Sequence, residues 1–328
     1  MKQRRLGATG EMVSAIGLGG AAVAGSYRKI DVSDGVRLIH RAIDLGIDHV
    51  DMSDLYGWGR GEEILGRSLV GRREEVFVAT KFGQLMADDG KTRIVRGDPP
   101  YVRACIDRSL GRLGIDYVDL YYAHRIDPDV PVEETIGAMA ELVTAGKVRH
   151  LGICEAAPAT IRRAHATHRL AAVQAEYSLW TRFAEDEIFG VCEELGIGYV
   201  AFSPIGRGFL SGEIKGEDDI AEGDLRRIHP RFKQENIDRN IGLLQTVTDV
   251  AVNHGVTNAQ VALAWVLAQR GFILPIPGTT TVAHLEENAA ALDLVLPAED
   301  IARLRDAFDP ALVAGDRMPP YAMEKLQK

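Results

Sequence analysis

Short apolar runs alternate with longer amphipathic stretches along most of the chain. Each run is rich in Val, Ile, Leu, Ala and aromatic residues and is bounded by Gly, Asp or another polar residue. Continuous apolar runs of this length are typical of strands that are buried on both faces. The pattern predicts strands at residues 15–18, 46–50, 76–80, 118–123, 150–153, 172–175, 198–202 and 272–276.

The stretches between these runs carry apolar residues at helical spacing. One of them begins at Pro131, has Glu133 and Glu134 in its first turn and stops at Gly146, which is the favoured order of residues in a helix. Helices are predicted at residues 32–45, 61–69, 99–113, 131–146, 158–166, 185–195, 241–253, 258–268, 282–292 and 297–308. Outside them we expect a hairpin at 2–13, a long loop at 84–98, a polar segment at 213–239 and an irregular tail at 309–328.

Strands and helices that alternate in this way build a parallel sheet covered by helices. Eight strand–helix units within 328 residues, without a linker or a shift in composition, predict one α/β domain over residues 1–328. We expect a (β/α)8 TIM barrel with an N-terminal β-hairpin and extra C-terminal helices. A doubly wound sheet is the alternative, but the turn at residues 17–20 lacks the G-x-G-x-x-G fingerprint of that fold.

Composition narrows the classes of partner. Hydrophobic residues make up 46% of the chain, charged residues make up 26%, and the formal net charge is −9. These values are ordinary for a globular enzyme, and the negative charge argues against nucleic acid or an anionic membrane as a general partner. An anionic cofactor remains compatible with them, since it needs only a local positive site.

The cysteines and the length of the apolar runs indicate the cellular compartment. Cys105, Cys154 and Cys192 are odd in number and lack metal-binding spacing, which favours reduced thiols and no metal site. The basic N-terminus is not followed by the apolar core of a secretory signal, and the apolar run 261–268 is too short to span a membrane. We therefore expect a cytoplasmic protein that has no membrane partner, and the sequence leaves its oligomeric state open.

Polar side chains close three consecutive predicted strands. Asp51, Lys81 and His124 stand at these strand ends, and Tyr56 lies on the loop after the first of them. Because the carboxyl ends of barrel strands form the catalytic face, we expect the four side chains to meet there. A neighbouring ammonium lowers the pKa of a phenol from about 10, so Lys81 would tune Tyr56 while Asp51 holds Lys81. This group suits protonation of a carbonyl oxygen, with His124 either hydrogen-bonded to that oxygen or sharing its proton.

The sequence resembles the aldo-keto reductases over almost its whole length. The similarity is carried by D-M-S-D-L-Y-G at 51–57, A-T-K-F-G at 79–83, Y-Y-A-H-R-I-D-P at 121–128, G-K-V-R-H-L-G-I at 146–153, Q-A-E-Y-S at 174–178, F-S-P-I-G-R-G-F-L-S-G at 202–212 and I-P-G-T-T at 276–280. Several of these runs resemble the branch that includes bacterial, yeast and plant enzymes similar to pyridoxal reductase and perakine reductase. The resemblance implies an NADP(H)-dependent barrel with Asp51, Tyr56, Lys81 and His124 as its catalytic tetrad.

The resemblance also implies a cofactor site. Cys154, Glu155 and Gln174 take the positions that hold the nicotinamide carboxamide, although the first two depart from the usual Ser-Asn pair. An aromatic residue that stacks on the nicotinamide corresponds to Phe202. The loop after it is similar to the pyrophosphate clamp, whose counterparts here are Ser203, Pro204, Gly206, Arg207, Gly208 and Leu210.

The site expected for the 2′-phosphate of NADP(H) departs further from the family. Many relatives carry Lys or Arg after the last strand, whereas this chain offers Gly278, Thr280 and His284. Hydroxyls at a helix N-terminus bind phosphate, but without a cation the preference for NADP(H) over NAD(H) falls, so NAD(H) is a second candidate cofactor. Glu287 and Asn288 match the residues that hold the adenine.

Four loop residues are candidates to line the substrate pocket: Ala22, Tyr27, Trp58 and Trp180. The expected activity is reduction of an aldehyde or ketone to an alcohol, with hydride from the nicotinamide and the proton from Tyr56. An alcohol or sugar dehydrogenase that runs mainly in the oxidative direction is an alternative. A nicotinamide-binding regulatory subunit is another, and a metal-dependent barrel enzyme has little support because His124 and Asp51 alone qualify as ligands.

Overall fold

A computed structural model describes residues 1–87, 93–324 and 326, and its centre is a parallel sheet of eight strands in the order β12-β11-β10-β9-β8-β5-β4-β3. Two backbone hydrogen bonds close the sheet on itself: Gly17 N–H donates to Pro275 O at 2.9 Å, and Gly19 N–H donates to Pro277 O at 3.1 Å. The predicted (β/α)8 barrel is therefore confirmed. Its strands are β3 (Leu18–Gly19), β4 (His49–Asp51), β5 (Phe77–Phe82), β8 (Val118–Ala123), β9 (Val148–Cys154), β10 (Leu170–Glu176), β11 (Gly198–Phe202) and β12 (Ile273–Ile276).

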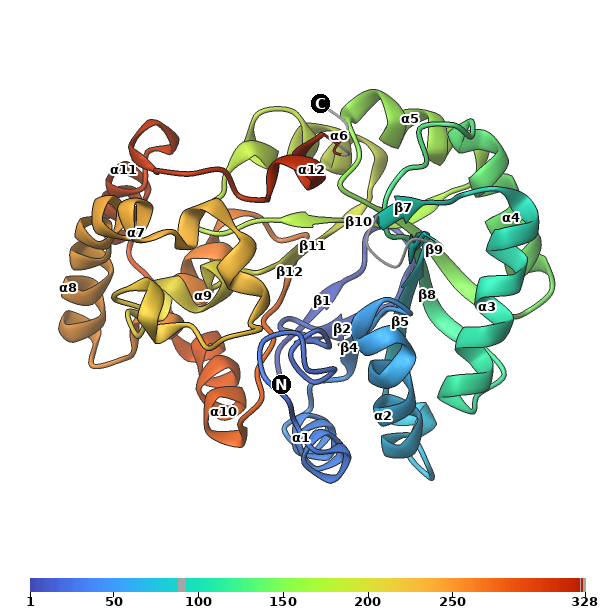
Figure 1. Cartoon of the computed structure of the whole chain (residues 1–328), viewed down its shortest axis with the longest axis horizontal. Coiled ribbons are helices and arrows are strands. Elements are labelled where there is room, and N and C mark those ends of the chain that lie inside the picture. The colour runs from blue at the N-terminus through green and yellow to red at the C-terminus, as the bar shows by residue number, and fades with distance from the viewer. Residues whose placement is uncertain (88–92, 325, 327–328) are drawn as a thin grey trace.

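Helices surround the strands as an outer ring (Figure 1). Local signals start them where the sequence predicts: the Asp98 carboxylate accepts the Tyr101 N–H ahead of α3, and Thr257 forms a capping box with Gln260 ahead of α9. The ring contains α1 (Val32–Asp44), α2 (Arg60–Ser68), α3 (Pro99–Leu113), α4 (Val132–Thr144), α5 (Pro158–Thr167), α6 (Ile188–Leu195), α8 (Leu244–His254), α9 (Asn258–Gln269), α10 (Val282–Ala290) and α11 (Ala298–Ala307). Within the described residues, no helix combines the length and apolar character that crossing a membrane requires.

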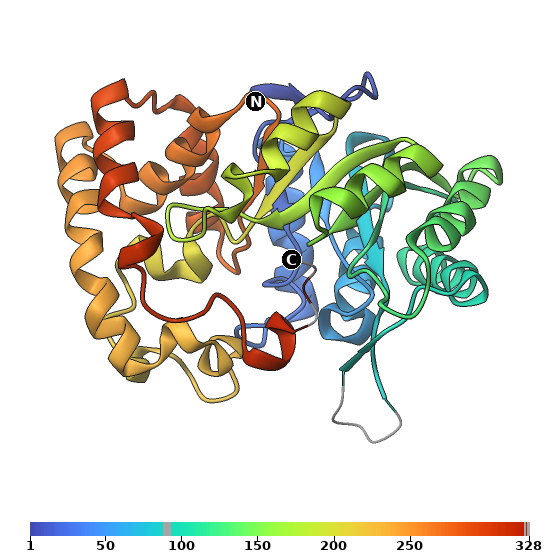
Figure 2. The same cartoon turned by 90° about the horizontal axis from the view of Figure 1, so that it is seen from above.

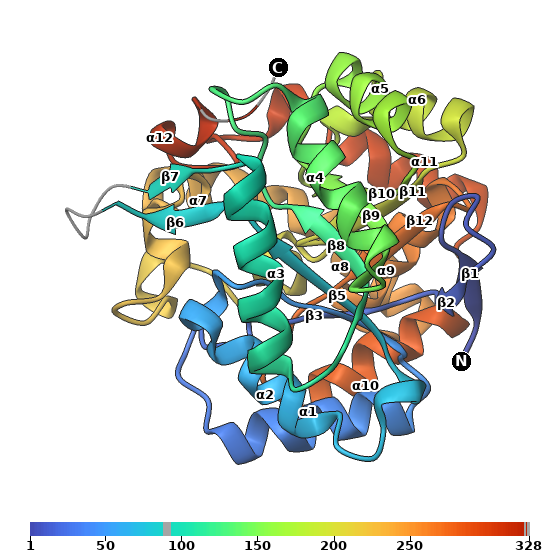
Figure 3. The same cartoon turned by 90° about the vertical axis from the view of Figure 1, so that its right-hand side faces the viewer.

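The N-terminal hairpin, β1 (Gln3–Arg5) and β2 (Met12–Ser14), closes one end of the barrel. Leu6 and Val13 are fully buried there and pack into the barrel interior with Leu120, Val200 and Leu274. A larger apolar layer fills the space between the outer face of the strands and the helices. Figures 2 and 3 show β6, β7, α7 and α12 at the end opposite the hairpin. The hairpin does not cover that end, so a site can form there.

Irregular segments hold more structure than the sequence predicts. The expected loop 84–98 contains the hairpin β6 (Gln84–Met86) and β7 (Arg93–Val95), and its residues 88–92 lie outside the described chain. The polar segment 213–239 contains short 3-10 turns and most of α7 (Gln234–Asn240). The tail contains α12 (Pro320–Met323). These elements are stabilised by contacts with residues distant in the sequence, so the local hydrophobic periodicity does not predict them.

Several element boundaries also differ from prediction, as two examples show. The apolar run 15–18 is buried, but only its last residue belongs to β3. An apolar run predicts burial, and a buried residue need not form the hydrogen bonds of a strand. The helix expected at 185–195 begins at Ile188, since Phe183–Glu185 forms a 3-10 turn.

Candidate active site

Strand register brings the polar strand-end residues to one place. Asp51 is the last residue of β4 and pairs with Ala79 of β5, while Lys81 pairs with Tyr122 of β8. Side chains alternate between the two faces of a strand, so Lys81 shares the barrel-interior face of Ala79. His124 follows β8 directly and shares the face of Tyr122 in the same way.

Lys81 and Asp51 form an ion pair with essentially no exposure to solvent. The Lys81 ammonium also donates to Met52 O at 2.7 Å and to the Tyr56 hydroxyl at 3.4 Å. Gln174 donates to the second Asp51 oxygen at 2.8 Å, so both oxygens of this carboxylate are satisfied. Burial disfavours the charged ammonium, but the charge of Asp51 outweighs it and raises the pKa of Lys81. A permanent positive charge therefore lies beside the phenol.

Tyr56 begins a short 3-10 turn after β4 and lies half-buried with its ring edge-on to His124, at 5.8 Å between ring centroids. Burial raises the pKa of Tyr56 above its ordinary value, and the Lys81 charge opposes this without reversing it. Lys81 lowers this pKa as expected, but burial outweighs its effect, so the net pKa lies above the ordinary value. A phenol with a raised pKa stays protonated at neutral pH, which is the state of a proton donor.

His124 is buried and its Nδ1 lies 3.1 Å from the Ser53 hydroxyl. Burial holds the pKa of His124 well below its usual range, and the charge of Lys81 lowers it further. The imidazole is therefore neutral at physiological pH. In the tautomer whose Nδ1 accepts from the Ser53 hydroxyl, the ring proton lies on Nε2 and the ring donates a hydrogen bond from there.

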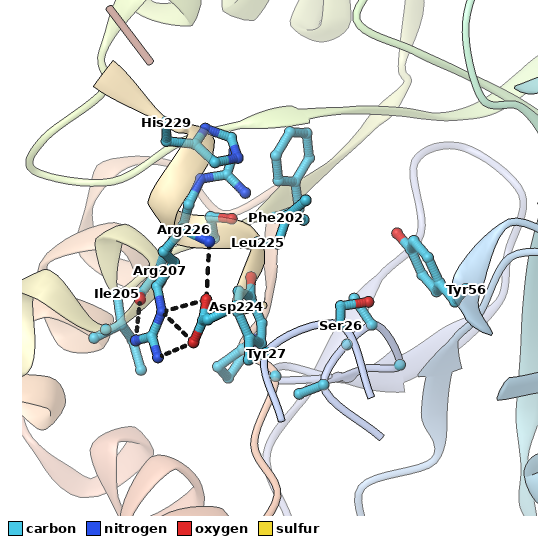
Figure 4. Close-up of a pocket in the computed structure, with 18 of the residues that line it drawn as sticks. Ser26, Tyr27, Tyr56, Phe202, Ile205, Arg207, Asp224, Leu225, Arg226 and His229 are labelled. Atoms are coloured by element: carbon cyan, nitrogen blue, oxygen red, sulfur yellow. Dashed lines mark hydrogen bonds and ion pairs between the residues drawn. The ribbon is translucent and has the colours of Figure 1, made fainter. Parts of the chain in front are cut away.

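A cavity of ≈ 950 Å³ opens above these residues. Asp51, Tyr56 and His124 line it, whereas Lys81 is fully buried and reaches it through Tyr56. Its walls come from the strand ends, the 19–28 loop, the 202–229 segment and the C-terminal tail. In Figure 4, Tyr56 lies across the cavity from Asp224 and Arg226, so the phenol and the arginine are at separate ends.

Most of the residues expected to hold the cofactor line this cavity. They are Cys154, Gln174, Phe202, Ser203, Pro204, Arg207, Gly208, Gly278, Thr280, His284, Glu287 and Asn288. Arg207 has a positive φ of 57° and pairs with the buried Glu176 at 3.1 Å. Gly206 and Leu210 of the same loop are buried, and neither belongs to the cavity wall, because they pack on the core beneath the loop.

Glu155 differs from its expected place. Its side chain is buried outside the cavity wall, where Oε1 accepts from Glu176 N–H at 3.0 Å and from Arg317 Nη1 at 3.0 Å. Its other oxygen accepts from Arg317 Nη2 at 2.5 Å. The expected role of Glu155 as a carboxamide acceptor is corrected on this ground, since the C-terminal tail already occupies both of its oxygens.

Three of the four expected substrate residues line the cavity, namely Ala22, Tyr27 and Trp58. Trp58 is 58% exposed and has a positive φ of 55°, a strained backbone for a bulky residue that holds its indole at the cavity wall. Trp180 is wrong as a substrate residue. It is buried and stacks on Phe209 at 4.0 Å between ring centroids, so it belongs to the core.

The cavity arginines that sequence reasoning missed include Arg28 and Arg226. Arg28, from the loop between β3 and α1, donates its Nε–H to the Thr280 hydroxyl at 2.8 Å. Arg226, from the polar segment, pairs with Asp224 at 2.6 Å and lies over the Tyr27 ring at 5.3 Å. Arg28 thus places a positive charge from the first βα loop beside Thr280, after the last strand.

The tail also reaches the cavity, although the sequence predicts only an irregular ending. Met318, Pro319, Tyr321 and Ala322 line the wall beside the substrate candidates. Arg317 anchors this stretch through Glu155, and its backbone carbonyl lies 3.1 Å from His229 Nδ1.

Comparison with known proteins places these features in a family. A profile of the Aldo/keto reductase family matches residues 15–309. A probable aldo-keto reductase from Glycine max is 43% identical over 316 residues, which cover 95% of this chain and 90% of the relative. The structure is similar to a glycerol dehydrogenase from Gluconobacter oxydans, with a TM-score of 0.86 and 25% identity over 97% of this chain and 98% of that one. It is also similar to an aldo-keto reductase from Bacillus halodurans, with a TM-score of 0.76 and 26% identity over 94% of this chain and 97% of that one. The chain therefore belongs to the aldo/keto reductase family.

Proposed function

We propose that this protein is an NADP(H)-dependent reductase of aldehydes or ketones, with Tyr56 as the proton donor. The observation that carries the proposal is the contact of the Tyr56 hydroxyl with Lys81, which is itself held by the buried Asp51. Such an arrangement provides a protonated phenol beside a fixed positive charge. It suits transfer of a proton to an oxygen on which negative charge develops.

The cavity residues fit a dinucleotide. Gln174 donates to Asp51 and so presents its amide oxygen as an acceptor for a carboxamide, and the Phe202 ring offers a stacking face. Arg207 and the backbone of residues 203–208 would face a pyrophosphate. Arg28 and Thr280 would hold the 2′-phosphate at the far end. When bound, NADPH supplies the hydride that the carbonyl carbon accepts.

The chain's own residues complete the reduction. Tyr56 gives its proton to the carbonyl oxygen, which becomes the alcohol, and the resulting phenolate lies 3.4 Å from the Lys81 ammonium. Neutral His124 donates a hydrogen bond to the same oxygen and fixes its position. Asp51 keeps Lys81 charged through the cycle. We also place the protein in the cytoplasm, in keeping with three buried cysteines that are not in disulfides.

Tryptophan fluorescence combined with a turnover assay tests the proposal. Purified protein is titrated with NADPH and then NADH, and absorbance is followed after a panel of aldehydes and ketones is added. Trp58 is the exposed tryptophan at the cavity, while Trp180 and Trp265 are buried, so Trp58→Phe identifies the reporting indole. Binding with turnover supports the proposal. Cofactor binding without turnover in either direction would instead favour a nicotinamide-sensing subunit, and no binding would refute both.

Oxidation of an alcohol is the second candidate. It is favoured by the similarity to the glycerol dehydrogenase from Gluconobacter oxydans. The same four residues would then work in reverse, with Tyr56 as the base. Assays with NADP⁺ and a panel of alcohols and polyols distinguish this direction from the first.

A further inference from the structure

Arg125 is a cavity arginine beside the catalytic residues, and no carboxylate of the described chain pairs with it. It directly follows His124, is half-buried, and donates to the His124 carbonyl at 2.6 Å. Across the part of the chain that the structure describes, no carboxylate oxygen lies within 4.0 Å of its guanidinium. Arg207 and Arg226, by contrast, pair with Glu176 and Asp224.

The position of Arg125 is at the reacting end of the cavity. Its charge acts on two neighbouring cavity residues, because it helps to lower the pKa of His124 and opposes the burial that raises the pKa of Cys154. A partly desolvated guanidinium without a carboxylate carries an unmet electrostatic cost. A bound oxyanion would offset that cost through charge-assisted, bidentate hydrogen bonds.

Part of the cavity wall is made of exposed apolar side chains. Trp58, Ile94 and Tyr321 are 58%, 37% and 47% exposed, and all three line the cavity. They come from three separate segments, namely the loop after β4, the β7 strand and α12. Exposed apolar side chains that converge on one pocket favour a ligand with an apolar body.

We propose that the preferred substrates are aldehydes or ketones that combine an apolar body with an anionic group, a carboxylate or a phosphate, and that Arg125 binds this anion. The inference rests on the proposed reductase function and adds a substrate class to it. Arg28 and Arg207 lie with the residues assigned to the cofactor, whereas Arg125 directly follows His124 and is the cation that we assign to the substrate anion.

Matched substrate pairs test the proposal in the wild-type enzyme. The 3- and 4-carboxybenzaldehydes are compared with their neutral methyl esters, and glyceraldehyde 3-phosphate is compared with glyceraldehyde, all with NADPH. We expect kcat/KM to favour the charged member of at least one pair by roughly 10- to 100-fold, the size of a hydrogen bond to a charged group. A preference within the benzaldehyde pairs identifies carboxylate as the preferred anion, and a preference within the glyceraldehyde pair identifies phosphate.

Two variants assign the effect to Arg125. Arg125→Met should abolish the preference, so that the ratio of kcat/KM between the charged and neutral members falls to about one, while Arg125→Lys should retain part of the preference. Arg96→Met is the control, because Arg96 lies just beyond β7, pairs with Asp98 and does not line the cavity. It should leave the preference unchanged.

The outcomes separate the inference from the function on which it rests. Turnover of neutral and charged members at equal efficiency would overturn the role of Arg125 and leave the reductase intact. A preference that survives in Arg125→Met would also overturn it. Absence of turnover on every carbonyl would instead refute the proposed function itself.

Discussion

Arg317 and Glu155 lie 162 residues apart in sequence and are joined by two side-chain hydrogen bonds beside the cavity. The same guanidinium lies 3.6 Å from Glu176, which also pairs with Arg207. One buried network therefore links the C-terminal tail to the strand ends and to the loop after β11. The tail residues that follow Arg317 line the cavity, so this ion pair sets the position of one of its walls.

Replacement of Arg317 by Met should destabilise the fold and loosen the tail. Glu155 would remain buried without its cation, and breaking a buried pair from one side costs about 3–5 kcal/mol. Denaturant unfolding measures the loss of stability, and steady-state kinetics should show a raised KM for the carbonyl substrate. Arg305→Met is the control, because the Arg305 side chain is 54% exposed and its pair with Glu185 should contribute at most about 1 kcal/mol. A loss from Arg317→Met no larger than that of the control would contradict the anchoring role.

Replacement of Tyr56 by Phe should separate cofactor binding from catalysis. The phenyl ring keeps the shape of the cavity wall but has no proton to give, so kcat should fall by at least about 10²- to 10⁴-fold. NADPH affinity, measured by Trp58 fluorescence, should remain within a few-fold of wild type. Tyr117→Phe serves as the control, since Tyr117 packs between Arg73 and Arg149 away from the cavity. Wild-type turnover in Tyr56→Phe would show that another group is the acid.

The two reaction directions should differ in how their rates depend on pH. Because the pKa of Tyr56 is raised, the phenol is protonated from neutral pH to beyond its ordinary value of about 10. Reduction uses the protonated form and should be independent of pH across that range. Oxidation uses the phenolate and should rise about tenfold per pH unit over the same range, until pH reaches the raised pKa. A reduction rate that falls through pH 7–8 would mean that another group titrates in the active state.

Asp51, Lys81 and His124 were predictable from sequence because each one ends an apolar run, and parallel strands in a barrel bring such ends together. Their alternation with inward-facing neighbours also fixed the side of the strand on which they lie. These properties are local, so a single chain is enough to find them.

Glu155 and Trp180 were misplaced because their orientation depends on distant partners. The carboxylate of Glu155 turns to Arg317, which no local pattern connects to it. The Trp180 indole turns inward onto Phe209, although the surrounding residues are those of a loop. Arg28 was missed for a similar reason, because its contact with Thr280 exists only once the barrel closes.

Removal of Arg28 should weaken NADPH much more than NADH. Its guanidinium is exposed at the Thr280 end of the cavity, where a 2′-phosphate would gain a charge-assisted hydrogen bond. Arg28→Ala should raise the dissociation constant for NADPH by roughly 10- to 100-fold and leave that for NADH nearly unchanged. Isothermal titration with both cofactors measures the two constants. Lys29→Ala is the matched control, since Lys29 is the next residue, exposed and outside the cavity wall. Equal losses for the two cofactors would place Arg28 away from the 2′-phosphate.

His229 should make the fold less stable as pH falls. Burial lowers the pKa of His229 to about 4, whereas an unfolded histidine titrates near 6.5. The unfolded chain therefore binds a proton that the folded chain refuses, so stability is lost as pH falls from about 6.5 towards 4. Between pH 7 and pH 5 this histidine alone should remove about 2 kcal/mol of the free energy of unfolding.

The variant His229→Gln isolates this contribution from the other groups that titrate in the same range. Asp54 is one of them, because burial raises its pKa to about 7 and gives it the opposite dependence, in which stability is lost as pH rises. Urea unfolding of both proteins at pH 7 and pH 5 gives a difference in which Asp54 cancels. We expect the wild type to lose about 2 kcal/mol more than His229→Gln, and we expect His168→Gln to behave like wild type. Equal acid sensitivity in wild type and His229→Gln would mean that His229 titrates normally, and that its contact with the Arg317 carbonyl does not keep it in a dry site.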